Sequence, residues 1–242
     1  MKNLQAEIDK RVVFIKEVLQ KSGASGIVYG NSGGKDSALV GILCKKATEN
    51  VVGVLMPCGS NRNYNEDMRD GIEVANAFNI ETMTVDLSDV KTALMEKIEK
   101  TVKLTDMSKG NISPRLRMTT LYAIALSKNC LVAGTGNRSE AYMGYFTKWG
   151  DGAHDFNPIA DLTVTEIYEM LAFLNAPMSV RTKAPSAALF DGQTDENEMG
   201  ITYAEIDKYL LEGKATDAVK EKIEKFHAKS EHKRNMPITF KG

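Results

Sequence analysis

The chain has 242 residues, 31 lysines and arginines against 32 aspartates and glutamates, and a formal net charge of −1. This length suffices for one large α/β domain with a buried core, so we expect residues 1–242 to form a single domain. The lack of a basic surplus argues against a nucleic-acid partner, and the lack of a leader or a long apolar run argues against a membrane and favours a cytoplasmic protein.

The first predicted element is an amphipathic helix that begins near Leu4 and ends at Gly23. Strand-like runs then alternate with helix-like segments. The expected strands are 26–30, 51–56, 81–86 and 130–134, and the expected helices are 37–47, 66–78, 88–104 and 115–128. This alternation predicts an α/β fold with a doubly wound parallel sheet flanked by helices, in which ligands bind beyond the carboxyl ends of the strands. The cysteines lie in or beside apolar runs, and we expect them to be reduced thiols in or near the core: Cys44, Cys58 and Cys130.

After residue 140 the sequence changes character. Residues 144–161 are typical of a loop, and capping boxes at Thr163 and Thr202 predict two helices, followed by a third from about residue 215. Little apolar periodicity is present around 179–200, where proline and glycine recur. We therefore expect 179–200 to be a mobile lid.

The segment Ser32–Ser37, with the sequence SGGKDS, joins an apolar strand to a helix. Its glycines let backbone N–H groups turn inward, its serines add donors, and the helix N-terminus adds positive charge, so phosphate is the expected ligand. It is no Walker A loop, because Asp36 follows Lys35 where Ser or Thr is needed. A carboxylate beside phosphate needs a cation between them, so Asp36 is expected to bind Mg²⁺. The alternative is a glycine-rich turn capped by Asp and Ser.

This segment resembles the PP-loop of the ATP pyrophosphatases. Further segments extend the resemblance to ammonia-dependent NAD synthetases over nearly the whole chain: GNSGGKDS (30–37), NISPRLRM (111–118), GTGNRSEAYMGYFTKWGD (134–151), KAPSAALFDGQTDENEMG (183–200) and HKR (232–234). The resemblance implies an adenine nucleotide alpha hydrolase-like fold and a homodimer. It also implies that ammonia amidates deamido-NAD to NAD through an adenylated intermediate, with ATP converted to AMP and pyrophosphate.

The resemblance also implies roles for individual residues. Glu140 would complete the Mg²⁺ site with Asp36. Apart from the resemblance, the nitrogen of ammonia has to lose a proton, and we expect a nearby carboxylate such as Asp155 to take it as a third catalytic residue. The residues implied for ATP are Gly30, Asn31, Ser32, Gly33, Gly34, Lys35, Asp36, Ser37, Thr135, Lys183 and Ser186. Those implied for deamido-NAD are Arg115, Lys148, Asp155, His232 and Lys233.

Each assignment has a simpler alternative. Glu140 is also an ordinary helix N-terminal glutamate. For Arg115 and Arg117 the alternative is a solvated helix face, and for His232 and Lys233 it is a charged tail. Lys148 and Asp155 lie in a predicted loop, where polar residues are common.

One position departs from the family pattern. Many members have a lysine that touches ATP where this chain has Val164. Either another cation such as Lys183 replaces it, or ATP is held more loosely.

The homodimer would bury apolar stripes of the helices 88–104 and 115–128 against a partner. The stripes are Val90, Leu94 and Ile98 on the first helix and Leu121, Ile124 and Ala125 on the second. The alternative is that these stripes face their own sheet.

Two other functions remain open. Another PP-loop ligase or tRNA-modifying enzyme would share the loop, although tRNA binding would favour a basic face with aromatic platforms. A non-catalytic nucleotide-binding module would keep the loop without needing two metal carboxylates.

Overall fold

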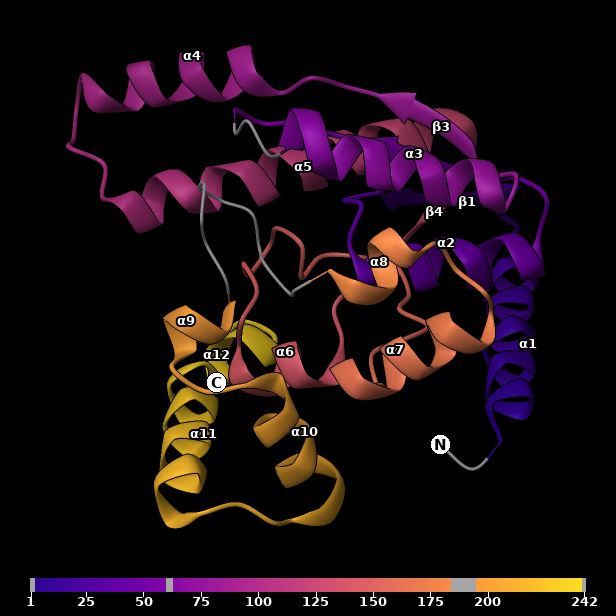
Figure 1. The fold of residues 1–242 in the computed structure, drawn as a ribbon. Helices are drawn as coiled ribbons and strands as arrows, with labels where there is room; N and C mark the ends of the chain where they lie inside the picture. Colours follow the sequence, from indigo (N-terminus) through magenta and orange to yellow (C-terminus); the bar gives the residue numbers. More distant parts are fainter. Residues whose placement is uncertain (1–2, 60–62, 184–194, 241–242) are drawn as a thin grey trace.

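A computed structural model describes residues 3–59, 63–183 and 195–240. At its centre lies a four-stranded parallel sheet with the order β3-β2-β1-β4 (Figure 1). The strands are β1 (Gly26–Gly30), β2 (Val51–Leu55), β3 (Glu81–Thr84) and β4 (Cys130–Ala133). The chain moves outward from β1 to β3 and returns to place β4 on the other side of β1. The strand order therefore reverses between β1 and β4. The glycine-rich segment Gly30–Gly34, called the phosphate loop from here on, begins at the end of β1.

Helices cover both faces of the sheet, which confirms the doubly wound architecture. Ile27 and Tyr29 of β1 face a core shared with α1 (Leu4–Ser22), α2 (Lys35–Ala47), α3 (Met68–Ala77) and α7 (Val164–Phe173). Val28 between them faces the opposite core, where α5 (Asp106–Lys128) packs and α4 (Ser88–Glu99) lies beyond it. Because successive side chains of a strand point to opposite faces, one strand supplies both cores.

Most of the remaining helices form a C-terminal group beside α6 (Figure 1). They are α6 (Arg138–Met143), α9 (Asp195–Met199), α10 (Tyr203–Glu212), α11 (Asp217–Lys229) and α12 (Glu231–Arg234). Apart from this group, α8 (Met178–Thr182) contacts α2 and α7. The predicted capping boxes at Thr163 and Thr202 are present, and a third begins α6 at Asn137. The side chain of Asp207 joins α10 to α6 and α7, because it accepts hydrogen bonds from Ser139 at 2.5 Å and from the backbone N–H of Thr165 at 2.7 Å.

Several predicted boundaries were wrong. α5 begins at Asp106 rather than at residue 115, with Pro114 inside the helix. Proline usually marks a helix start, but here Thr105 caps an earlier turn and Pro114 is buried. A π-helix, Asn63–Asp67, precedes α3, and short helices α8 and α9 lie in the segment expected to be a lid. Residues 184–194 of that lid fall outside the described residues.

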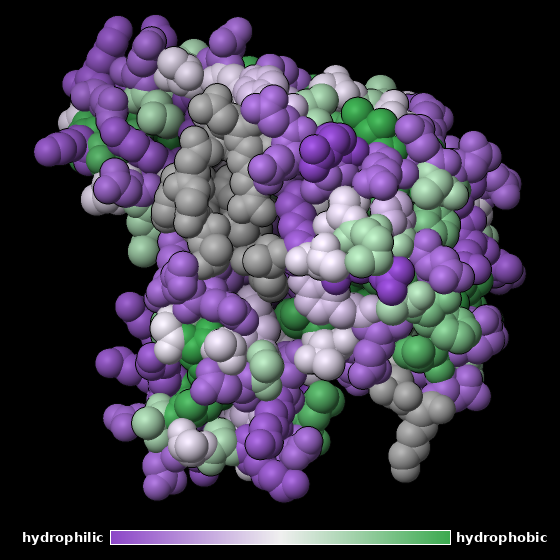
Figure 2. All heavy atoms as spheres, in the orientation of Figure 1, coloured by the Kyte–Doolittle hydropathy of each residue, from purple (hydrophilic) through white to green (hydrophobic). Residues whose placement is uncertain are grey.

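The surface bears on the expected dimer. The stripe of Leu121, Ile124 and Ala125 packs on its own sheet, whereas Val90 and Leu94 of α4 are exposed. Hydrophilic side chains dominate the face seen in Figure 2, and hydrophobic ones are scattered over it in small groups. No helix in the described residues is long and apolar enough to cross a membrane. The three cysteines are buried and free, as predicted.

The hydroxyl group of Tyr29 provides a test of the core. Tyr29 is fully buried, and its hydroxyl has no hydrogen-bond partner among the described residues. Cβ atoms added at Gly41 and Gly53 would lie 2.4 and 2.9 Å from this oxygen, so both glycines leave room for it. An unsatisfied buried polar group costs about 1–3 kcal/mol.

We therefore expect Tyr29→Phe to raise the free energy of unfolding by about 1 kcal/mol in urea denaturation. Tyr142→Phe is the control, because the Tyr142 hydroxyl donates to Glu224 at 3.2 Å and its loss brings no gain. A Tyr29→Phe variant less stable than the natural protein would contradict the conclusion that the buried hydroxyl group of Tyr29 is unsatisfied.

Candidate functional site

A cavity of about 1060 Å³ opens at the carboxyl ends of β1, β2 and β4. The phosphate loop, the ends of the three strands, α5, and the segments around α6 and α12 line it. Open α/β sheets bind ligands at this edge. The cavity therefore lies where the order of the strands predicted a ligand.

The phosphate loop, Gly30–Gly34, is packed tightly against the start of α3. Gly33 has a φ of +67°, and a Cβ added there would lie 2.1 Å from the carbonyl oxygen of Asp67, so glycine is required. Asn31 donates through Nδ2 to the carbonyl of Gly71 at 2.9 Å. Gly34 begins α2 without a side-chain cap, which leaves the first backbone N–H groups of that helix for an anion.

Lys35 is buried at the base of the cavity between two carboxylates. Its side chain is 5% exposed, and its Nζ lies 2.7 Å from Oδ2 of Asp36 and 4.0 Å from Oε1 of Glu140. Burial lowers the pKa of Lys35, but the charges of Asp36 and Glu140 outweigh that effect and raise it. Lys35 is therefore an ammonium cation at neutral pH.

Asn137 holds both carboxylates in place. Its Nδ2 donates to Oδ1 of Asp36 at 3.0 Å, and its backbone N–H donates to Oε2 of Glu140 at 3.2 Å. Each carboxylate thus uses one oxygen on Asn137 and directs the other toward Lys35. The helix-capping alternative for Glu140 is also true, because Glu140 closes the capping box of α6. The cap and the cavity-facing role coexist in one side chain.

This donor set fits Mg²⁺. Mg²⁺ prefers carboxylate oxygens, keeps several waters and is usually bound by one or two carboxylates together with substrate phosphates. Two carboxylates converge here beside a phosphate loop. Among the described residues, no group of three or more His, Cys, Asp or Glu side chains is arranged to hold a metal by itself. An Mg²⁺ site made of these two carboxylates and completed by phosphate oxygens of the substrate would agree with the pair of carboxylates and with the lack of a third such ligand among the described residues.

The other residues expected to bind ATP divide into three cases. Thr135 lines the cavity, after β4. Lys183 also lines it, but its Nζ bonds Asp67 at 2.8 Å and Asp70 at 2.7 Å. Ser186 lies outside the described residues. Val164 is buried in an apolar cluster with Met143 and supplies no polar contact.

The residues expected to bind deamido-NAD gather at one side of the cavity, except Asp155. Arg115 donates to the carbonyl of Lys148 at 3.3 Å, and Lys148 in turn donates to the carbonyl of His232. Lys233 donates to the carbonyls of Gly144 and Phe146, each at 2.7 Å. These contacts join α12 to the loop after α6. Lys148 and Lys233 therefore bind backbone of their own chain in this structure.

Asp155 lies elsewhere. Its carboxylate accepts the backbone N–H of Val132 at 2.7 Å and the hydroxyl of Tyr122 at 3.3 Å, and it is not among the residues that line the cavity. It continues the hydrogen bonding of β4 by means of a side chain. The geometry gives no support to Asp155 as a proton acceptor inside the cavity.

Sequence reasoning missed several charged residues that line the cavity, among them Asp151 and Arg117. Asp151 accepts the backbone N–H of Thr147 at 3.0 Å, and burial raises its pKa above the usual value. Arg117 donates through Nε to the carbonyl of Met56 at 3.1 Å, and burial lowers its pKa. Both belong to the family-like segments quoted above. No sequence signal separated Arg117 from the exposed Arg115, two residues away on the same helix.

The pKa of Glu140 provides a second test. Burial, and then the charge of Asp36, raise it well above its usual value of 4.5, against the lowering effect of Lys35. A raised native pKa means that the native state binds more protons here than the unfolded state does. The stability that Glu140 contributes is therefore present below the unfolded pKa and lost as pH rises through the native pKa.

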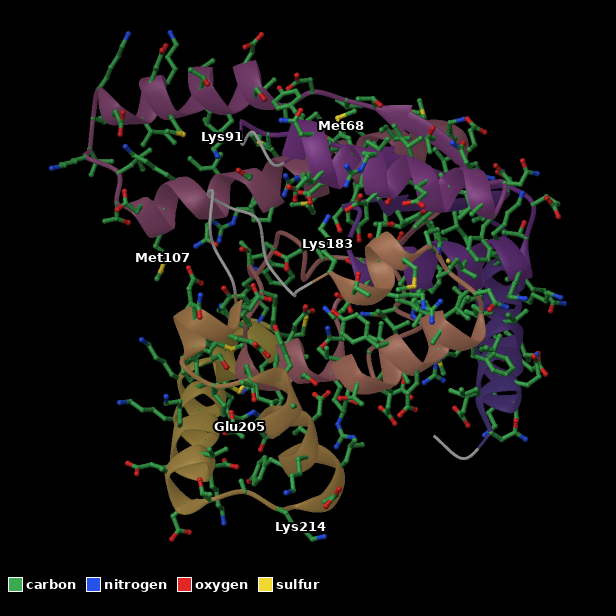
Figure 3. The ribbon with its side chains drawn as sticks, in the orientation of Figure 1. Met68, Lys91, Met107, Lys183, Glu205 and Lys214 are labelled. Atoms are coloured by element: carbon green, nitrogen blue, oxygen red, sulfur yellow. The ribbon has the colours of Figure 1, made fainter. Side chains whose placement is uncertain are left out.

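We expect Glu140→Gln, which cannot ionise, to gain stability over the natural protein as pH rises from about 5 to 8, measured by urea unfolding without nucleotide or metal. The matched control is Glu205→Gln. Glu205, labelled in Figure 3, occupies the same capping position in α10, but hydrogen bonds to Thr202 lower its pKa. Its effect should be nearly constant over this range. A pH-independent difference for Glu140→Gln would contradict the raised pKa.

Known proteins resemble this chain over nearly its whole length. Residues 7–237 match the NAD synthase family. The NH(3)-dependent NAD(+) synthetase of Carboxydothermus hydrogenoformans is 44% identical over 238 residues, which cover 97% of each chain. Among solved structures, NMN synthetase from Francisella tularensis has a TM-score of 0.93 and 37% identity, covering 98% of both chains. NH3-dependent NAD synthetase from Campylobacter jejuni has a TM-score of 0.79 and 32% identity, covering 99% of both.

Proposed function

Because the chain belongs to the NAD synthase family, we propose that it amidates deamido-NAD with ammonia to give NAD, at the expense of ATP. The single observation that carries this proposal for the site is the pair of carboxylates, Asp36 and Glu140, that converge on Lys35 at the end of the phosphate loop. A binding module would not need that pair.

The chemistry must overcome a poor leaving group. A carboxylate oxygen of the nicotinate attacks the α-phosphorus of ATP, the bond to the β-phosphate oxygen breaks, and pyrophosphate leaves. Ammonia then attacks the activated carbonyl carbon, AMP leaves with the original carboxylate oxygen, and the nitrogen loses a proton. Catalysis consists mainly of holding two anions in line and stabilising the charge that develops.

The residues of the chain divide these tasks. The backbone of Gly30–Gly34 and the uncapped start of α2 would hold the ATP phosphates, with Lys35 as a fixed cation beneath them. Asp36 and Glu140 would hold Mg²⁺, which neutralises charge on the departing pyrophosphate. Thr135 would contact the nucleotide from the carboxyl end of the neighbouring strand β4. Arg115, Lys148 and His232 lie where the dinucleotide would cross the rim of the cavity.

Ammonia requires a proton acceptor. Asp151 lines the cavity and has a pKa raised by burial, so it can accept a proton more readily than an ordinary aspartate. Asp155 is engaged with Val132 and Tyr122 outside the cavity. We therefore infer that Asp151, rather than Asp155, takes the proton.

A second candidate acceptor comes from the comparisons. The TM-score to the NMN synthetase of F. tularensis is 0.93, against 0.79 for the NAD synthetase of C. jejuni. The same chemistry on nicotinate mononucleotide would give NMN. The two acceptors share the nicotinate carboxylate and differ in the adenylate half, so the ratio of their kcat/KM values separates the two functions.

The test is an assay with ATP, Mg²⁺, ammonium and either acceptor. We expect amidated product, AMP and pyrophosphate in equal amounts. Asp36→Asn keeps the shape of the side chain but loses its charge, and it should lower turnover at least about 100-fold. The control is Asp9→Asn, an exposed position on α1. Near-normal turnover by Asp36→Asn at ordinary Mg²⁺ would contradict the placement of Asp36 in the metal site. If neither acceptor is amidated, the proposed reaction is wrong and another reaction of the PP-loop enzymes takes its place.

We also propose a homodimer. Val90 and Leu94 are exposed apolar residues of α4, where the resemblance places a partner. We expect light scattering under assay conditions to give the mass of two chains, and Leu94→Glu to reduce it toward one. A monomeric mass for the active natural protein would contradict this assembly.

A further inference from the structure

The ammonium group of Lys183 lies between α8, α3 and the phosphate loop. Its Nζ donates to Oδ1 of Asp67 at 2.8 Å, to Oδ2 of Asp70 at 2.7 Å and to the carbonyl of Gly33 at 3.3 Å. An ammonium group has three N–H donors, so these three acceptors use all of them. Figure 3 shows Lys183 between α8 and the beginning of α3, which Met68 marks.

This ion group is largely removed from water. The side chains of Lys183, Asp67 and Asp70 are 14%, 10% and 5% exposed. Asp70 also meets Arg69 at 3.1 Å, but that arginine is 73% exposed and its charge is screened by solvent. Removing one partner of a buried ion pair leaves an uncompensated charge, which costs far more than the pair contributes. Lys183 is thus a buried cation that bonds both of these buried carboxylates, and the charge of Arg117 also acts on Asp67.

The backbone that carries these carboxylates packs against the phosphate loop, and Lys183 bonds both carboxylates and the carbonyl of Gly33. The carbonyl oxygen of Asp67 occupies the space beside Gly33 where a Cβ would be, and Asn31 bonds to the carbonyl of Gly71. The loop and the start of α3 are therefore in direct contact. Without the charge of Lys183, the two carboxylates would place excess negative charge beside the backbone groups that have to receive a polyphosphate, in a poorly solvated place where repulsion is strong.

We propose that Lys183 is a positioning residue: it neutralises Asp67 and Asp70 beside the phosphate loop, and so allows the loop to bind ATP, without itself touching phosphate. The inference rests on the proposed function and replaces the direct phosphate contact that the sequence suggested for Lys183. It also answers the question raised by Val164, because Lys183 is committed to two carboxylates and does not substitute for the missing family lysine.

The test is a thermodynamic cycle on MgATP binding, measured by titration calorimetry with no acceptor or ammonium present. Lys183→Met is made in the natural background and in the background of Asp67→Asn with Asp70→Asn. We expect at least about a tenfold rise in Kd for MgATP in the natural background. In the background without the two carboxylates, we expect the same change to alter Kd by less than about threefold.

Direct phosphate binding by Lys183 predicts a different cycle, in which Lys183→Met weakens MgATP binding equally in both backgrounds. That result would overturn the proposal. Lys214→Met, a change of a 72% exposed lysine on the C-terminal group, is the control and should leave Kd unchanged. If the Lys183→Met single variant does not fold by circular dichroism, the comparison within the Asp67→Asn, Asp70→Asn background alone decides between the two roles.

The readout is independent of the acceptor. If neither deamido-NAD nor nicotinate mononucleotide is amidated but the cycle behaves as expected, the role of Lys183 stands and the proposed reaction falls. If the natural protein does not bind MgATP at all, both fall.

Discussion

The ammonium group of Lys35, buried between the carboxylates of Asp36 and Glu140, constrains the whole site. The two carboxylates come from different strand ends, and they meet only because β4 pairs with β1. Asn137 fixes both by hydrogen bonds from its side chain and its backbone. The pairing of β1 with β4 and the hydrogen bonds of the buried Asn137 therefore fix the positions of the charged groups that would face phosphate.

The same principle explains the other cations around the cavity. Lys183 bonds two aspartates, and Lys233 bonds two carbonyl groups of the loop after α6. These ammonium groups hold the walls together. A lysine in a family motif is easily taken for a ligand contact, yet a cation can serve a site by compensating the protein's own oxygens. The order of the walls then precedes binding, which lowers the cost of ordering them on association.

Sequence reasoning recovered the sheet, its flanking helices and the loop at the end of β1, because apolar periodicity and the SGGKDS segment are local signals. It misplaced the start of α5, since the burial of Pro114 is a tertiary effect that overrides a local rule. It named Asp155 as a site residue and did not consider Asp151, which lines the cavity. Three residues separate these two aspartates, and only the path of the loop decides which one lines the cavity.

The pairing of β1 with β4 has a consequence for how the protein is made. Asp36 and Asn137, which hydrogen bond across the site, are 101 residues apart. At about 5–20 residues per second on the ribosome, one edge of β1 waits about 5–20 s for its neighbour to be synthesised. An apolar strand with an open edge invites pairing with another chain. During that interval the nascent protein depends on rapid packing of α1 and α2 or on chaperones, and it cannot assemble its two carboxylates until residue 140 has left the ribosome.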